Sequence, residues 1–151
     1  MASITPFLWY DTQAEDAARF YCGIFPDSGV DRVMKGPDGK AFGLEFHLGG
    51  QSFMALNGGP MYKFTPAISL YVNCKDQKEV DTLWAKLSAV PKAEQCGWIV
   101  DKYGLSWQII PEALPRLLGD KDPAKAGRAM QAMMQMKKID VKALERAAAG
   151  K

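Results

Sequence analysis

The stretch that decides the fold is AISLYVNCKDQKEVDTLWAKL, residues 67–87, which reads as a strand followed by an amphipathic helix. Branched and aromatic side chains dominate residues 67–72, as in a strand. Asp76 is a candidate N-cap, and Glu79 stands three residues later, as in a capping box. The apolar side chains that follow have the i, i+3, i+4, i+7 spacing of a helix with one buried face: Val80, Leu83, Trp84 and Leu87. Shorter strands are expected at 98–100 and 105–110.

The first half of the chain repeats this order of elements without repeating the sequence. Residues 4–10 predict a strand, and Thr12 with Glu15 predicts a capping box at the start of a helix. Residues that fall on one helical face are expected to pack on a sheet: Ala14, Ala17, Ala18, Tyr21 and Phe25. Three strands are then expected, at 30–35, 42–48 and 52–56.

The repeated order predicts an α+β fold of two βαβββ modules, about 1–60 and 64–111, whose curved mixed sheets enclose a cleft. A C-terminal helical tail spans 112–151. In the tail, Asp122-Pro123 predicts one helix start and Ile139-Asp140 predicts another.

The glycine pair Gly49-Gly50 predicts a two-residue hairpin that sets the strand register in the first module. In that register His47 pairs with Ser52, and Phe46 pairs with Phe53. Phe46, Phe53 and Asn57 then share one face of the sheet, while His47 and Glu45 share the other. The cleft is expected on the face that carries Asn57, so His47 is expected to point away from it.

The composition is that of an ordinary globular protein with its own core. The 151 residues are 48% hydrophobic and 24% charged, and the formal net charge is only +2. Lysines and arginines are scattered among acidic residues and form no basic stripe, which argues against a nucleic acid or a polyanionic membrane as partner. Three cysteines without CxxC spacing, no signal-peptide pattern and no membrane-spanning run favour a cytoplasmic protein.

Several segments resemble a known family. They are FTPAISL at 64–70, EQCGW at 94–98 and DKYGLSWQI at 101–109, with MKKID at 136–140 similar as well. Together they resemble the PhnB-like family of the vicinal oxygen chelate superfamily, which includes glyoxalases, bleomycin-resistance proteins and extradiol dioxygenases. This family is often labelled 3-demethylubiquinone-9 3-methyltransferase-like. The resemblance implies a glyoxalase-like fold and a homodimer.

The resemblance also implies four strand positions that hold a divalent metal in the superfamily. By strand register these fall at Thr5, Asn57, Ala67 and Gln108. Threonine and alanine offer a metal little, and two neutral amides are weak ligands for transition metals, which prefer imidazole, thiolate or carboxylate. The metal site is therefore expected to be degenerate, and no cofactor is predicted, with an atypical divalent metal as the alternative.

The side chains expected to bind a ligand are mainly aromatic or amide-bearing: Phe7, Trp9, Asn57, Phe64, Tyr71, Gln95, Cys96, Trp98 and Gln108. Cys96 is also the candidate nucleophile, although a buried small apolar residue is the competing interpretation. The other candidates for acid–base chemistry are Glu45, His47 and Asp101.

The sequence therefore predicts a protein that binds a small molecule, with an enzyme of lyase, isomerase or oxygenase type as the alternative. Methyl transfer is disfavoured, because the first strand ends in Tyr10-Asp11-Thr12-Gln13 without the glycine-rich turn that would hold S-adenosylmethionine. The tail methionines Met130, Met133 and Met134 are expected in a homodimer interface or in the core.

Overall fold

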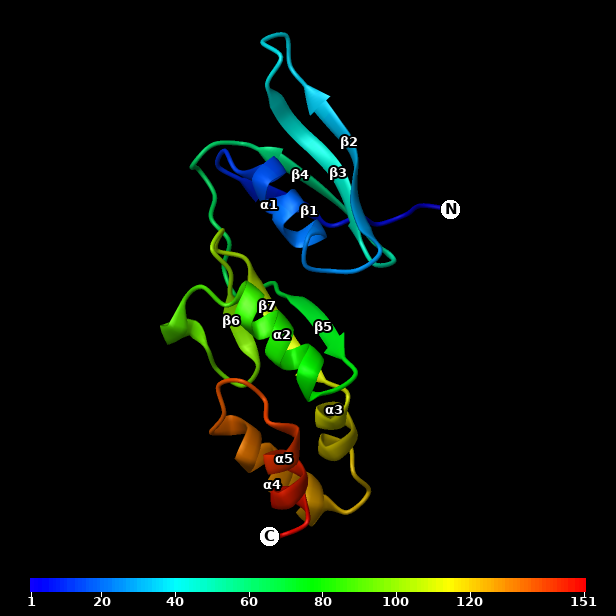
Figure 1. Cartoon of the computed structure of the whole chain (residues 1–151), viewed down its shortest axis with the longest axis vertical. Coiled ribbons are helices and arrows are strands. Elements are labelled where there is room, and N and C mark those ends of the chain that lie inside the picture. Colours follow the sequence, from blue (N-terminus) through cyan, green and yellow to red (C-terminus); the bar gives the residue numbers. More distant parts are fainter. The chain divides into compact units, whose positions relative to one another are not determined.

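The computed structural model describes all residues, 1–151, and divides into two compact units, Met1–Phe64 and Thr65–Lys151 (Figure 1). Each unit has its own sheet and its own core. No helix in the structure is both long enough and apolar enough to cross a bilayer.

The first unit is a complete βαβββ module. Its elements are β1 (Phe7–Tyr10), α1 (Ala14–Cys22), β2 (Ser28–Lys35), β3 (Ala41–Leu48) and β4 (Gln51–Asn57). The sheet order is β1-β4-β3-β2, with β1 parallel to β4 and the other pairs antiparallel. The predicted element order is thereby confirmed for this half of the chain.

Helix α1 covers one face of this sheet. Tyr21 from α1 and Tyr10 from β1 are both buried, and their hydroxyl oxygens lie 3.1 Å apart. Phe46 of β3 stacks on Phe53 of β4 with 5.2 Å between ring centroids. Burying an aromatic side chain of this kind contributes about 1.5–3 kcal/mol, so this cluster anchors the unit.

The hairpin register is confirmed, since His47 pairs with Ser52 and Phe46 with Phe53. It places Asn57 beside Tyr10, on the face that α1 covers. The opposite, open face carries Trp9, which pairs with Leu56.

The predicted capping box at Thr12 is wrong. Helix α1 begins at Ala14, its N-cap residue is Gln13, and the Gln13 side chain makes no capping hydrogen bond to the helix. The acceptor comes instead from β4, because Asn57 Oδ1 accepts from the Ala14 N–H at 2.8 Å. A cap supplied by a residue so far along the chain has no local sequence signature.

The second unit begins as the first does but has one strand fewer. It contains β5 (Leu70–Cys74), α2 (Gln77–Leu87), the 3₁₀ turn η1 (Pro91–Ala93), β6 (Trp98–Val100) and β7 (Ser106–Pro111). The order is β5-β7-β6, with β5 parallel to β7. The mixed α+β architecture is confirmed, but this module is βαββ where βαβββ was expected.

The missing strand has a physical cause in residues 88–97. Pro91 begins the 3₁₀ turn and has no N–H for a sheet ladder. The N–H groups of Cys96 and Gly97 donate instead to the carbonyls of Met136 and Lys137, at 2.8 and 2.7 Å. This stretch therefore forms a corner tied to the tail rather than a sheet edge.

Helix α2 covers one face of the β5-β7-β6 sheet. Its N-cap is the predicted one, because Asp76 Oδ1 accepts from the Glu79 N–H at 2.9 Å. The α2 side chains Val80, Leu83 and Leu87 are buried on this side, as are Trp107 and Ile109 of β7.

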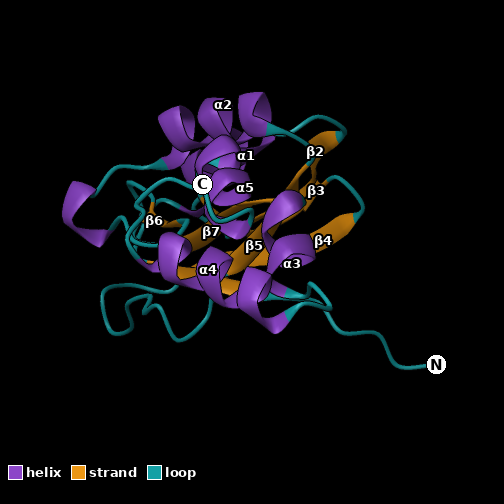
Figure 2. Ribbon diagram, turned by 90° about the horizontal axis from the view of Figure 1, so that it is seen from below, coloured by secondary structure: helices purple, strands orange, loops and turns teal.

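The tail forms three helices, α3 (Ala113–Leu118), α4 (Pro123–Met134) and α5 (Val141–Ala148). Asp122 and Asp140 cap α4 and α5 as expected, whereas α3 was not predicted. The helices share a core: Ile110, Leu114, Leu117, Ala129, Ile139, Leu144 and Ala148. Within the second unit, α2 lies on one side of the strands and α3 and α4 lie on the other (Figure 2).

Candidate functional site

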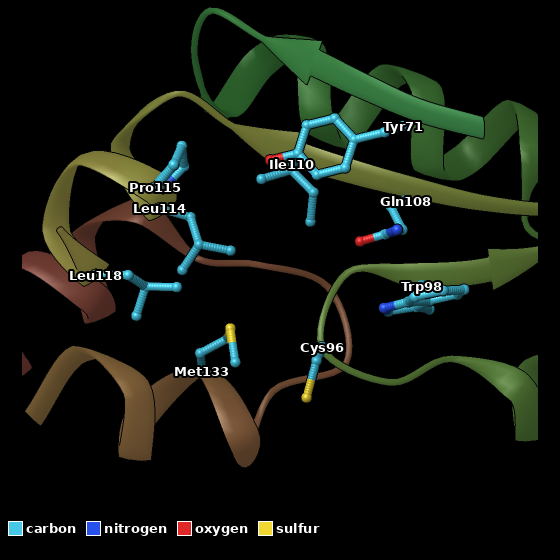
Figure 3. Close-up of a pocket in the computed structure, with 9 residues that line it drawn as sticks. All are labelled: Tyr71, Cys96, Trp98, Gln108, Ile110, Leu114, Pro115, Leu118 and Met133. Atoms are coloured by element: carbon cyan, nitrogen blue, oxygen red, sulfur yellow. The ribbon is translucent and has the colours of Figure 1, made fainter. Parts of the chain in front are cut away.

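A pocket of about 250 Å³ lies within the second unit, on the sheet face opposite α2 (Figure 3). Three parts of the chain form it: the strands, the corner before β6, and helices α3 and α4. The lining residues are Tyr71, Cys96, Trp98, Gln108, Ile110, Leu114, Pro115, Leu118 and Met133.

The sheet wall is a row of side chains from three adjacent strands. Gln108 of β7 pairs with Tyr71 of β5 on one side and with Trp98 of β6 on the other. Because side chains alternate along a strand, Trp107 and Ile109 point to the α2 side while Gln108 and Ile110 point into the pocket. The sequence of β7 thus serves the core and the pocket on alternate residues.

Cys96 sits at the corner in a left-handed backbone conformation. Its φ is 50°, and Gly97 follows with φ 86°. A Cβ on Gly97 would lie 2.6 Å from Ile110 Cδ1, so the Ile110 side chain would have to shift, and the positive φ would strain any larger residue. The two tail carbonyls that accept from this corner hold it in place. The Cys96 thiol is half-buried and accepts from Gln95 Nε2 at 3.2 Å.

The helical wall is apolar. Leu114, Pro115 and Leu118 come from α3, and Met133 comes from α4. Proline is tolerated at position 115 because it lies in the first turn of α3, where N–H groups have no helical partner.

The polar atoms in the pocket are few and neutral. Gln108 Nε2 donates to Ser69 Oγ at 3.0 Å, which leaves Oε1 as a free acceptor. The Trp98 indole N–H has no partner within the chain, and its nitrogen points toward the cavity (Figure 3). Partial burial raises the pKa of Tyr71, with a smaller contribution from Cys74, so the phenol stays neutral near physiological pH. None of the lining residues is an acid, a base or a histidine.

Five of the nine predicted ligand-binding residues lie in or beside this pocket. Tyr71, Cys96, Trp98 and Gln108 line it. Gln95 stands next to it, where its amide bonds the Cys96 thiol and the Met134 carbonyl.

The other predicted residues belong to the first unit. Phe7 is 52% exposed on the open face of the sheet. Trp9 Nε1 donates to the Gly59 carbonyl at 2.9 Å, and its ring meets Tyr62 edge-on. Phe64 meets Tyr10 edge-on with 5.1 Å between centroids.

Asn57 is committed to the fold. Its Oδ1 caps α1 at Ala14, and its Nδ2 donates to the Ala41 carbonyl at 3.2 Å. Both ends of the amide are therefore used inside the first unit, on the side that α1 covers. The expectation that this amide faces a ligand disagrees with these bonds.

The four positions that the sequence resemblance implies for a metal offer little to a metal ion here. Ala67 has no side-chain donor, the Asn57 amide is engaged at both atoms, and only Gln108 faces a pocket. No three or more His, Cys, Asp or Glu side chains come together in a way that could hold a metal ion. A metal would need ligands other than this inherited set.

The remaining acid–base candidates serve structural contacts outside the pocket. His47 Nδ1 lies 2.9 Å from Asp31 Oδ1, and Glu45 pairs with Arg32 at 2.8 Å. Asp101 is 1% exposed and accepts from the N–H groups of Tyr103 and Leu105 and from Trp107 Nε1. With these hydrogen bonds Asp101 stabilises the turn before β7.

Several pocket residues were missed from the sequence. They are mainly the apolar residues of the walls, with Ser69 behind Gln108: Ile110, Leu114, Pro115, Leu118 and Met133. The apolar spacing of Leu114, Leu117 and Leu118 could have indicated a helix. The prolines at 111 and 115 obscured this signal, because proline is usually read as a helix breaker.

Comparison with known proteins places this architecture in a family. The model of a family described as 3-demethylubiquinone-9 3-methyltransferase matches residues 2–110, so α3 to α5 lie beyond the matched range. A Bacillus cereus structure described as "putative 3-demethylubiquinone-9 3-methyltransferase, PhnB protein" is 33% identical, with a TM-score of 0.63. The match covers 73% of this chain and 99% of that one.

Two further solved structures are similar. A Pseudomonas aeruginosa protein is 16% identical with a TM-score of 0.59, over 74% of this chain and 98% of that one. A Frankia domain described as "glyoxylase/bleomycin resistance protein/dioxygenase" is 14% identical with a TM-score of 0.49, over 74% and 92%. No curated protein matches the chain.

Proposed function

The chain belongs to the 3-demethylubiquinone-9 3-methyltransferase family, and from this premise we propose that it binds a small, neutral organic molecule in the pocket of its second unit. The observation that carries the proposal is the pocket itself, which combines apolar walls with a few neutral polar atoms. Ligand sites commonly have this make-up, in which apolar surface supplies affinity and a few polar groups fix orientation.

The size and charge of the pocket narrow the ligand class. An engineered apolar cavity of about 150 Å³ holds benzene, so a volume of about 250 Å³ suits a body of one or two rings. The absence of Lys and Arg from the lining disfavours a phosphonate, which would leave its charge without a partner.

The family description does not by itself carry methyl transfer to this chain. Strand β1 ends at Tyr10 and is followed by Asp11 and Thr12, so it lacks a glycine-rich turn for a nucleotide-like cofactor. We therefore limit the proposal to the binding of a small molecule, without methyl transfer and without a bound metal.

A titration with 2-naphthol tests the proposal. Met133→Trp puts a larger side chain into the pocket and should weaken binding by about tenfold or more, because a 1.4 kcal/mol loss is tenfold. Met130→Trp is the matched control, since Met130 lies on the same helix but does not line the pocket. Equal binding by both variants, at equal stability, would place the ligand elsewhere and overturn the proposal.

Native mass spectrometry with metal analysis tests the part of the proposal that concerns binding without a metal. The protein is purified without chelators, and a small organic mass without metal is the expected adduct. Stoichiometric zinc, nickel, manganese or iron would show that other ligands serve a metal and would overturn this part.

A further inference from the structure

The Gln108 amide is restrained from behind by Ser69. The Nε2 group donates to Ser69 Oγ at 3.0 Å, a distance typical of an ordinary hydrogen bond. Ser69 lies just outside β5 and directly precedes Leu70, the first residue of β5 that pairs with β7. The amide is thereby held with its carbonyl oxygen toward the cavity, as Figure 3 shows.

Trp98 supplies the opposite polarity beside this oxygen. It is the antiparallel cross-strand partner of Gln108, and side chains in such pairs have Cβ atoms about 4.5–5.5 Å apart. Its indole nitrogen is a donor only. The pocket thus presents one restrained acceptor and one donor side by side, against apolar walls from α3 and α4.

We propose that Ser69 is a positioning residue that fixes the Gln108 carbonyl oxygen toward the pocket, and that the pocket consequently selects neutral ligands carrying a hydrogen-bond donor. This inference rests on the proposed function of the same pocket. A hydroxyl suits the pair, because it can donate to Gln108 Oε1 and accept from Trp98 Nε1–H at once. An ether or a carbonyl can only accept, so it would bury the Gln108 oxygen without a partner.

Two probes of nearly the same shape separate these cases. 2-Naphthol carries a donor, whereas 2-methoxynaphthalene carries only an acceptor. Wild-type protein is expected to bind 2-naphthol about tenfold more tightly than 2-methoxynaphthalene. The reason is that 2-methoxynaphthalene would leave the Gln108 carbonyl oxygen buried without a donor, and this lowers affinity by about tenfold. Affinities are measured by equilibrium titration of the full chain.

Variants then assign the preference to the two residues. Ser69→Ala and Gln108→Leu are expected to bring the affinity ratio of the two probes close to one. Ser69→Thr keeps a hydroxyl and should restore the ratio. Gln108→Glu offers only acceptors to the pocket and should keep the preference for the donor probe. A purely structural role for Ser69 would change both affinities together and leave the ratio unchanged.

The outcomes separate this inference from the proposed function. Equal affinity of wild-type protein for both probes overturns the selectivity and leaves the binding pocket standing, as does an unchanged ratio in Ser69→Ala. A preference for 2-methoxynaphthalene shows that the amide is turned the other way and also overturns it. If neither probe binds to wild-type protein, both the inference and the binding of such ring compounds fail together.

Discussion

The two units of the molecule share a three-strand pattern but differ in what lies beside it. In both, the first strand runs parallel to the last, and the last pairs with its antiparallel neighbour: β1-β4-β3 in one, β5-β7-β6 in the other. The first unit adds β2 as a fourth strand, whereas the second has a corner at 95–97 that the tail holds. The pocket of the second unit lies at this corner, which stands in place of a fourth strand. The absence of that strand leaves room for the pocket.

The same contrast appears in two amides. Asn57 ends β4 and faces α1, which it caps, while Gln108 lies within β7 and faces the pocket. The sequence resemblance implied both as metal positions, yet one stabilises the fold and the other faces the pocket. The face of the strand, rather than the residue type, decides between these roles.

The largest effect is expected at the corner itself. Gly97→Ala should destabilise the protein by about 3 kcal/mol or more, because a left-handed backbone strains alanine and the new Cβ would press on Ile110. Gly104→Ala is the control, since Gly104 has φ 89° but nothing within 4 Å of the added Cβ. It should lose only about 1–2 kcal/mol in urea denaturation. Equal losses would mean that the corner is not tightly packed.

The next effect separates the two amides. Asn57→Ala should lower the free energy of unfolding by about 2 kcal/mol, because it removes the cap of α1 and leaves the Ala14 N–H without an acceptor. Gln108→Ala should lose less than about 1 kcal/mol, since its partner Ser69 can turn to water.

Asn57→Asp provides the control for this pair. It keeps an oxygen for Ala14 and places a negative charge at a helix N-terminus, so it should recover part of the loss. If Gln108→Ala proved as damaging as Asn57→Ala, the division of roles would be wrong.

A smaller effect concerns the thiols of the two units and appears only at alkaline pH. Burial raises the pKa of Cys74 from 9.0 to about 12, with Glu79 adding to the rise. The folded chain therefore keeps a proton that the unfolded chain loses, and stability should fall as pH rises from about 9 to about 12. Cys74→Ala should show a shallower decline in urea denaturation between pH 8 and 10.5.

Cys22 of the first unit provides the comparison for this slope. Burial raises its pKa as well, with Asp31 adding and Arg19 opposing. Cys22→Ala should flatten the decline less than Cys74→Ala does. Parallel slopes for wild type and Cys74→Ala would contradict the prediction.

Substitution of the exposed methionines of α4 is expected to have the smallest effect on stability and to change the oligomeric state instead. Met130 and Met134 are 42% and 56% exposed, and the homodimer expected from the sequence stays a prediction. If this face forms the interface, the wild type should sediment as a dimer at micromolar concentration, and Met130→Lys with Met134→Lys should sediment as a monomer. Gln131→Lys adds a charge to the same helix and should remain dimeric. A monomeric wild type would rule the interface out.

The sequence predicted what local patterns determine. The helix caps at Asp76, Asp122 and Asp140 and the hairpin at 49–50 each depend on residues within a few positions of one another, and all four are present. These signals were sufficient for the α+β class and for the order of elements in the first unit.

The errors arose where distant residues decide. The side of the sheet to which Asn57 points is set by α1, through contacts such as Tyr10 with Tyr21, and no local pattern reports it. The corner at Cys96 depends on carbonyls some forty residues later in the chain. The pocket was therefore predicted in its strand half and missed in its helical half.

The hydrogen bonds between the corner and the tail also mean that the corner can form only after the tail has been synthesised. A ribosome adds about 5–20 residues per second, so Met136 follows Gly97 by roughly 2–8 s. Until then the corner lacks its acceptors, and Ile110 lacks the helices that later cover it. During synthesis the corner and Ile110 therefore stay uncovered until the tail helices are made.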